Sequence, residues 1–260
     1  MNHRSAGSRT WQTDKMTLLD NRDFINATVR AVNGGIPGTN KQYDANRISA
    51  ELIEMLFAEL NEPSGVHLET ALTTLGALAG FSGQMAIRET LIKTGKISED
   101  KAFTIAKTQS GEIYYFGNLL NEILFSNKPG VVSISGMIGG AVQQAGGTSL
   151  PDIGDIVRHV AGTVGSSAFG VQRLPPHHMP RIPPIALLDR FWNPMRNFMV
   201  VNVHSPPQWP LVIGLAAQNV IVMAKDRLDL GLAARIVMEA IIPSASADPA
   251  KIHFAHFQSY

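Results

Sequence analysis

The sequence contains no cysteine among its 260 residues. This absence excludes disulfide bonds, thiolate nucleophiles, iron–sulfur clusters and zinc sites that need cysteine ligands. A chain without cysteine fits a reducing compartment, and the first 15 residues have no apolar run typical of a secretory signal. We therefore expect a cytoplasmic protein.

Charge is also scarce, because charged residues make up only 17% of the chain and hydrophobic residues 45%. The 22 Lys and Arg residues nearly balance the 21 Asp and Glu residues, for a formal net charge of +1. No overall field attracts a polyanion, so the composition does not indicate nucleic-acid binding. Low charge leaves more neutral or apolar surface, which favours self-association. We expect a homo-oligomer, with a dimer favoured.

Long uncharged stretches are present, but none has the character of a membrane span. Residues 66–87 contain one charged residue, Glu69, and residues 205–224 contain none. Both stretches are interrupted by polar residues that a span avoids, namely Thr73, Thr74, Ser82 and Gln84 in the first and Gln208, Gln218 and Asn219 in the second. We predict two buried helices and no transmembrane segment.

Glycines line one side of the first of these helices. Gly76, Gly80 and Gly83 are spaced three or four apart, and each costs a helix roughly 1 kcal/mol relative to alanine. Their presence therefore indicates that another backbone packs close to them. A second uncharged segment, residues 131–145, carries Gly136, Gly139 and Gly140. We expect the two glycine-striped helices to form the centre of the fold and to pack on each other.

The remaining helices are predicted from apolar spacing and from capping residues. Expected caps are Asp20, Asp44, Ser64, Ser149 and Asp229, and Pro243 is expected to end the last helix. Residues 103–116 alternate in polarity around a turn at Gly111, which predicts a β-hairpin. The fold class is thus mainly α, about eight helices with one hairpin, in a bundle-like core.

The organisation along the chain is predicted as three parts. Residues 1–15 form a flexible arm, residues 16–242 a single helical domain, and residues 243–260 a tail. Within the domain, residues 165–184 are dense in Gly, Pro and His and are predicted to form a long ordered loop. Loops of this length in compact domains are often functional.

Known catalytic motifs are lacking. No GxGxxG, GxxxxGK[ST] or HExxH pattern occurs, and the sequence from Gly80 to Gln84 fails the GxSxG pattern at its fifth position. The pair His67 and Glu69 repeats the H-x-E of zinc deaminases, but that chemistry needs later cysteines. The motifs identify no family, no catalytic residue and no cofactor.

Three polar residues at the start of the central helix form a candidate ligand site. His67, Glu69 and Thr70 lie in its first turn, where the exposed amides and the positive end of the helix dipole suit an anionic ligand. The alternative is structural, with Glu69 as a helix-terminal charge and His67 as a neighbour of the cap.

A second candidate is a metal site at Asp155 and His159, which are four residues apart and share a helical face. The same spacing also describes an ordinary surface pair. Two further imidazole pairs, His177 with His178 and His253 with His256, are expected to be exposed to solvent.

These observations predict a non-catalytic, self-associating protein that binds a small ligand or a protein partner. The alternative is a metal-dependent hydrolase in which His67 and Glu69 converge with Asp155 and His159, about 90 residues further along. A third class is a peripheral membrane protein that uses residues 206–224.

Overall fold

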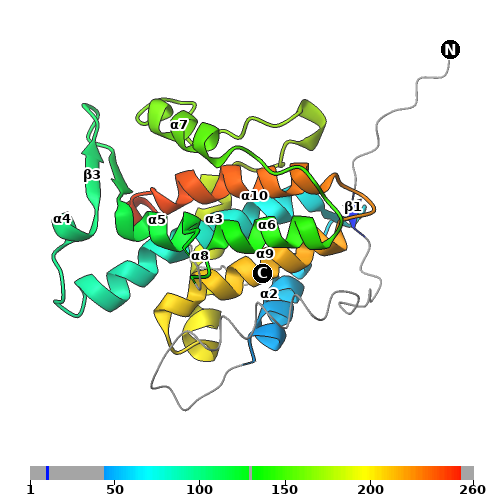
Figure 1. Cartoon of the computed structure of the whole chain (residues 1–260), viewed down its shortest axis with the longest axis horizontal. Coiled ribbons are helices and arrows are strands. Elements are labelled where there is room, and N and C mark those ends of the chain that lie inside the picture. Colours follow the sequence, from blue (N-terminus) through cyan, green and yellow to red (C-terminus); the bar gives the residue numbers. More distant parts are fainter. Residues whose placement is uncertain (1–9, 12–43, 129–130, 253–260) are drawn as a thin grey trace.

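The computed structural model describes residues 10–11, 44–128 and 131–252. Within them are nine α-helices and two small antiparallel sheets (Figure 1). The prediction of a mainly helical fold with one β-hairpin is confirmed. The helix predicted after Asp20 lies outside the described residues. None of the helices in the described part of the chain is long and apolar enough to cross a membrane.

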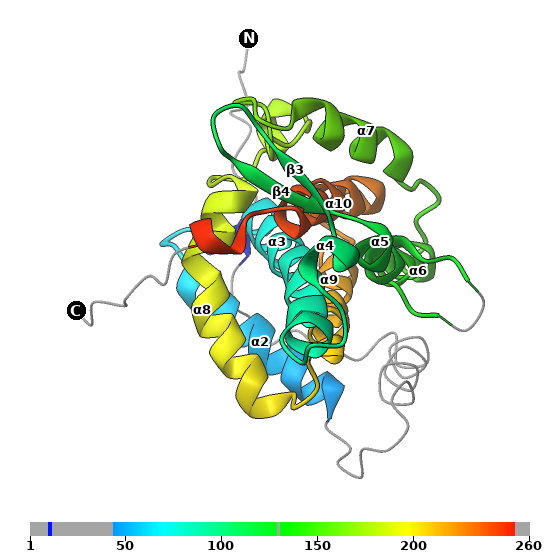
Figure 2. The same cartoon turned by 90° about the vertical axis from the view of Figure 1, so that its left-hand side faces the viewer.

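Helix α3, Leu68–Ile87, is the centre of the molecule, and every residue in it except Met85 is buried. The four other longest helices lie around it, as Figure 2 shows. They are α2 (Ala45–Leu60), α8 (Pro184–Asn202), α9 (Trp209–Met223) and α10 (Leu230–Ala245). Helix α6, Ile134–Gln144, packs on α9 and α10, and α7, Ile153–Thr163, lies outside α10. The short helices are α4 (Glu99–Ala102) and α5 (Asn118–Phe125).

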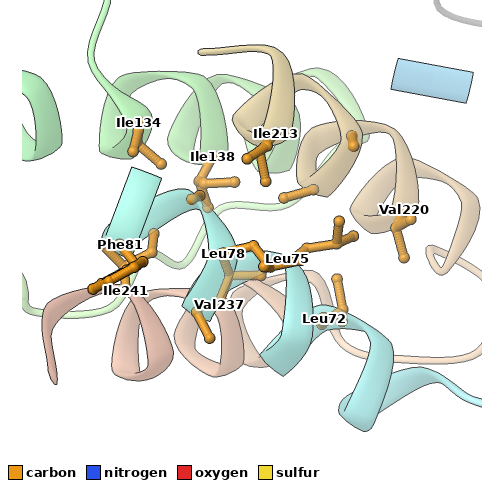
Figure 3. Close-up of a cluster of buried hydrophobic side chains, with 14 of the residues drawn as sticks. Leu72, Leu75, Leu78, Phe81, Ile134, Ile138, Ile213, Val220, Val237 and Ile241 are labelled. Carbon is orange, nitrogen blue, oxygen red and sulfur yellow. The ribbon is translucent and has the colours of Figure 1, made fainter. Parts of the chain in front are cut away.

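The core is formed where α3, α6, α9 and α10 meet (Figure 3). Leu75 and Leu78 of α3 are fully buried, as are Ile213 of α9 and Val237 of α10. Burying a side chain of this size contributes about 1.5–3 kcal/mol relative to leaving it exposed. This contact surface holds the helices in place.

Gly76 and Gly80 of α3 face α10 and Gly83 lies against α5, so the predicted pairing of the two glycine-striped helices is wrong. A Cβ atom on Gly80 would lie 2.1 Å from the carbonyl oxygen of Ile241, and one on Gly76 would lie 2.5 Å from that of Val237. Helix α6 instead places Met137 against Gly214 of α9. The sequence shows that a backbone must approach α3, but its glycines do not specify which helix supplies it.

Helix ends follow the predicted caps in part. Asp44 and Asp229 cap α2 and α10 by accepting hydrogen bonds from backbone amides. Ser64 does not cap α3, because residues 66 and 67 form strand β2 (Val66–His67) and His67 is the N-cap. Similarly, Asp152 rather than Ser149 caps α7. Strand β2 pairs with β1 (Thr10–Trp11) from the predicted N-terminal arm.

The last helix continues past Pro243 to Ala245, so the predicted end is wrong by two residues. A proline removes its own backbone donor and crowds the carbonyl of the preceding turn, which can bend a helix without ending it. The residues that follow Pro243 are buried, with Ala245 fully so. A 3-10 turn, Pro249–Lys251, then closes the described chain. The division into arm, domain and tail stays a prediction, although residues 243–245 belong to α10, and Ala247 and Ile252 are buried in the core.

The predicted hairpin consists of β3 (Thr104–Lys107) and β4 (Ile113–Phe116), with Ile105 opposite Tyr115. Gly111 in the turn has a φ of +85°, which glycine adopts readily. The hairpin is attached to the end of α10, because the backbone N–H of Tyr115 donates to the carbonyl of Ser246 at 3.0 Å.

The loop between α7 and α8 lies across the helices, as Figure 1 shows. It contains a 3-10 turn, Pro176–His178. The buried Gln172 side chain accepts a hydrogen bond from Thr73 of α3 at 3.2 Å and donates to the carbonyl of Ile236 in α10 at 2.7 Å. The loop predicted at residues 165–184 is therefore ordered and bound to two core helices.

Candidate functional site

The first turn of α3 meets the loop between α7 and α8 in a buried polar cluster. We call His67, Glu69, Thr70 and His178 the Glu69 cluster. Glu69 is only 2% exposed, and each of the other three is 8% exposed or less. His67, Glu69 and Thr70 are the residues predicted from the sequence, whereas His178 was expected to be exposed, and that prediction is wrong.

Glu69 lies between two imidazoles. Its Oε1 atom accepts a hydrogen bond from Nδ1 of His178 at 2.8 Å, and its Oε2 atom lies 3.4 Å from Nε2 of His67. The second distance exceeds the usual N–H···O range, and Oε2 has no hydrogen-bond partner among the described residues. The carboxylate thus holds His178 firmly and His67 loosely.

The hydrogen bonds of His67 define its tautomer. Its Nδ1 atom accepts the backbone N–H of Thr70 at 3.3 Å and lies 2.9 Å from the Thr70 hydroxyl. A backbone N–H can only donate, so Nδ1 carries no proton and the neutral ring is protonated at Nε2, on the side of Glu69. The Thr70 hydroxyl also accepts the backbone N–H of Arg181 at 3.0 Å.

Burial lowers the pKa of His67 below its ordinary value of 6.5, while Glu69 raises it and His178 lowers it further. Burial has the largest effect because it disfavours the charged ring. His67 is therefore neutral at pH 7, in agreement with the acceptor role of Nδ1.

The Glu69 cluster fastens the loop to the helix start. The anion-binding role predicted for this turn depends on free backbone amides. The amide of Thr70 is instead bonded to His67, and the carboxylate of Glu69, which would repel an anion, lies beside the same imidazole. The geometry therefore supports the structural alternative, and the ligand role of His67, Glu69 and Thr70 stays a prediction.

The second candidate pair lies in α7. Oδ2 of Asp155 accepts a hydrogen bond from Arg173 at 2.7 Å, and this bond lowers the pKa of Asp155. Arg173 also faces the buried Glu239 of α10, which Arg235 binds at 3.0 Å. The Nε2 atom of His159 is buried and has no hydrogen-bond partner among the described residues. Asp155 thus belongs to an arginine–carboxylate network.

Metal ligands do not gather in the part of the chain that the structure describes. No group of three or more His, Asp or Glu side chains there could hold a metal ion. The predicted metal site at Asp155 and His159 stays a prediction.

A pocket of about 540 Å³ lies under the hairpin. We call it the hairpin pocket. Four segments far apart in the sequence line it: the start of β4, the loop after α7, the start of α8 and the end of the described chain. Its lining residues are Glu112, Ile113, Tyr114, Ser166, Ser167, Phe169, Pro183, Ile185, Ala186, Asp189, Ala247, Asp248, Lys251 and Ile252.

Sequence reasoning did not identify this pocket. Its residues come from a hairpin, a loop, a helix start and the predicted tail, and no spacing rule connects these segments. The one available signal was the Gly- and Pro-rich segment 165–184, which supplies four of the lining residues, namely Ser166, Ser167, Phe169 and Pro183.

Comparison of the sequence with protein-family models finds no match, and comparisons with curated proteins and with solved structures find none either.

Proposed function

We propose that this protein binds a small organic ligand in the hairpin pocket. The observation that carries the proposal is the pocket itself, with a volume of about 540 Å³. Sites for small molecules and cofactors are concave, mostly apolar and about 300–1,000 Å³ in volume. Ile113, Tyr114, Phe169, Ile185 and Ile252 supply apolar surface, and a few charged side chains lie among them.

The walls of the pocket are held in place by contacts outside it. The hydrogen bond from Tyr115 to Ser246 joins the hairpin to the end of α10. Gln172 and His178 bind the loop to α3 and α10. A site that exists before the ligand arrives loses less conformational freedom on binding, which favours affinity.

A pocket-filling variant tests the proposal. Ala186 is exposed in the first turn of α8 and lines the pocket, so Ala186→Trp should occupy the space without disturbing the core. The matched control is Ala58→Trp, an exposed alanine of α2 that does not line the pocket. The probe is N-phenyl-1-naphthylamine, a neutral dye that fluoresces more strongly in apolar surroundings.

We expect the dye to bind the wild type and Ala58→Trp and to lose most of its fluorescence gain with Ala186→Trp. Equal fluorescence with all three proteins, or no gain with the wild type, would overturn the proposal. Native mass spectrometry of freshly purified protein would also reveal the mass of any ligand that remains bound.

The proposal takes up one part of the function predicted from the sequence. Self-association and the absence of catalysis stay predictions. The metal-dependent hydrolase would need His67 and His159 to bind one ion, and no contact among the described residues supports that convergence.

A further inference from the structure

The charge of the hairpin pocket differs from that of the chain. Among the described residues, three carboxylates, Glu112, Asp189 and Asp248, line it together with a single cation, Lys251. The formal charge of the lining is therefore negative, whereas the whole chain carries +1. A concave site with a net negative charge raises the local concentration of cations.

Lys251 does not cancel this charge. Its Nζ atom lies 3.7 Å from Oε1 of Glu112, beyond hydrogen-bond distance, and the two side chains are 57% and 38% exposed. Ion pairs this exposed and this long are weak, because water screens them. Asp248 uses one carboxylate oxygen to cap the following turn through the amide of Ala250 at 3.0 Å.

Two aromatic rings stand beside the carboxylates. Tyr114 and Phe169 meet edge to face, with ring centroids 4.5 Å apart and an angle of 65° between their planes. Burial raises the pKa of Tyr114, as does the neighbouring Glu112, so the phenol stays neutral at physiological pH. Neutral rings attract a cation through their π faces and also cover apolar surface.

Resting on the proposed function, we propose that the ligand of the hairpin pocket is an organic ammonium ion with an apolar, ring-sized body. The ammonium group binds at Glu112 and Asp248, next to the Tyr114 and Phe169 rings. The body contacts the isoleucines of the lining. An organic carboxylate of the same size would face like charges instead.

Three probes of nearly equal size test the ligand class: 2-phenylethylammonium, 2-phenylethanol and 3-phenylpropionate. They are titrated into the full chain at pH 7 and low salt, and binding is measured by displacement of the dye. We expect the ammonium ion to bind about ten-fold more tightly than the alcohol, and the carboxylate to bind most weakly.

Two charge variants provide internal controls. Glu112→Gln should weaken the ammonium ion about three- to ten-fold and leave the alcohol unchanged. Lys251→Gln should instead strengthen binding of the ammonium ion, since it removes the one cation that the described part of the chain contributes to the lining. Both side chains are more than one third exposed, so neither change is expected to impair folding.

The outcomes separate the ligand class from the function. If 3-phenylpropionate binds the wild type as tightly as 2-phenylethylammonium does, and neither probe binds Ala186→Trp, the pocket is a ligand site but the cationic class is wrong. If all three probes bind equally, the class is also wrong. If no probe distinguishes the wild type from Ala186→Trp, the proposed function itself fails.

Discussion

The carboxylate of Glu69 accepts a hydrogen bond from His178 at 2.8 Å, across 109 residues of sequence. Glu69 stands in the first turn of the central helix, and His178 stands in the loop that passes on to the hairpin pocket. Both side chains are 10% exposed or less. This contact therefore fixes the loop to the core from the inside, where water does not compete.

The Glu69–His178 contact should contribute measurably to stability. Replacing one partner of a buried charged hydrogen bond leaves the other unsatisfied, so Glu69→Ala should lower the free energy of unfolding by about 2–3 kcal/mol. Denaturation in urea measures this change. The exposed Glu54 of α2 offers the control, since Glu54→Ala should change stability by less than about 0.5 kcal/mol.

The double variant Glu69→Ala with His178→Ala isolates the interaction. Its loss of stability should be smaller than the sum of the two single losses, because the contact can be lost only once. Strictly additive losses would show that the hydrogen bond contributes nothing.

The sequence predicted the helix that carries Glu69 but not the partner of Glu69. Apolar spacing and polar caps are local signals, and they located α2, α3, α10 and the hairpin. His178 lies in a Pro-rich loop, where local rules favour exposure, and only tertiary contacts bury it. The hairpin pocket was missed for the same reason, since Tyr114, Phe169 and Lys251 come together only through the fold.

Stability should fall at mildly acidic pH because of His67. Its pKa is lowered in the folded state from the ordinary 6.5, so between the two pKa values the unfolded chain binds more protons. The stabilisation is complete above about pH 6.5 and is lost as the pH falls below that value. Urea denaturation at pH 7.5 and at pH 5.5 should show this loss in the wild type.

Substitution of His67 identifies the titrating group. His67→Asn keeps a side-chain oxygen that can accept the Thr70 amide but cannot titrate, so its stability should depend less on pH over this range. His204 is exposed, and His204→Asn should behave like the wild type. An unchanged pH dependence in His67→Asn would assign the effect to other groups.

The close approach of α3 and α10 should make Gly80 intolerant of any side chain. The Cβ of Gly80→Ala would meet the Ile241 carbonyl oxygen at 2.1 Å, and both helices would have to separate. Overpacking of this kind costs about 1–3 kcal/mol.

Gly162 in α7 is the matched control, because nothing lies within 4 Å of the position of its Cβ. Gly162→Ala should raise stability by about 0.5–1 kcal/mol through helix propensity alone. In thermal denaturation, the midpoints of Gly80→Ala and Gly162→Ala should therefore shift in opposite directions from that of the wild type. A lowered midpoint for both variants would mean that propensity and packing do not explain these glycines.

Two fully buried glutamines should respond in opposite ways to the same substitution. Gln84 of α3 donates from Nε2 to the carbonyls of Ala245 and Ala247, at 2.9 and 3.0 Å, and accepts from Arg88. Gln218 of α9 has no partner for either amide atom among the described residues. A buried amide without partners keeps its desolvation cost, and methionine has a similar shape without that cost.

We therefore expect Gln218→Met to raise the free energy of unfolding by about 1 kcal/mol and Gln84→Met to lower it by about 2 kcal/mol. Urea denaturation of the two variants under the same conditions measures both changes. A loss of stability in Gln218→Met would show that its amide is hydrogen-bonded in solution, and a polar binding partner would then have to be sought beside α9. Opposite signs would show that the end of α10 is held to α3 by Gln84, which fixes the wall of the hairpin pocket nearest Ala247.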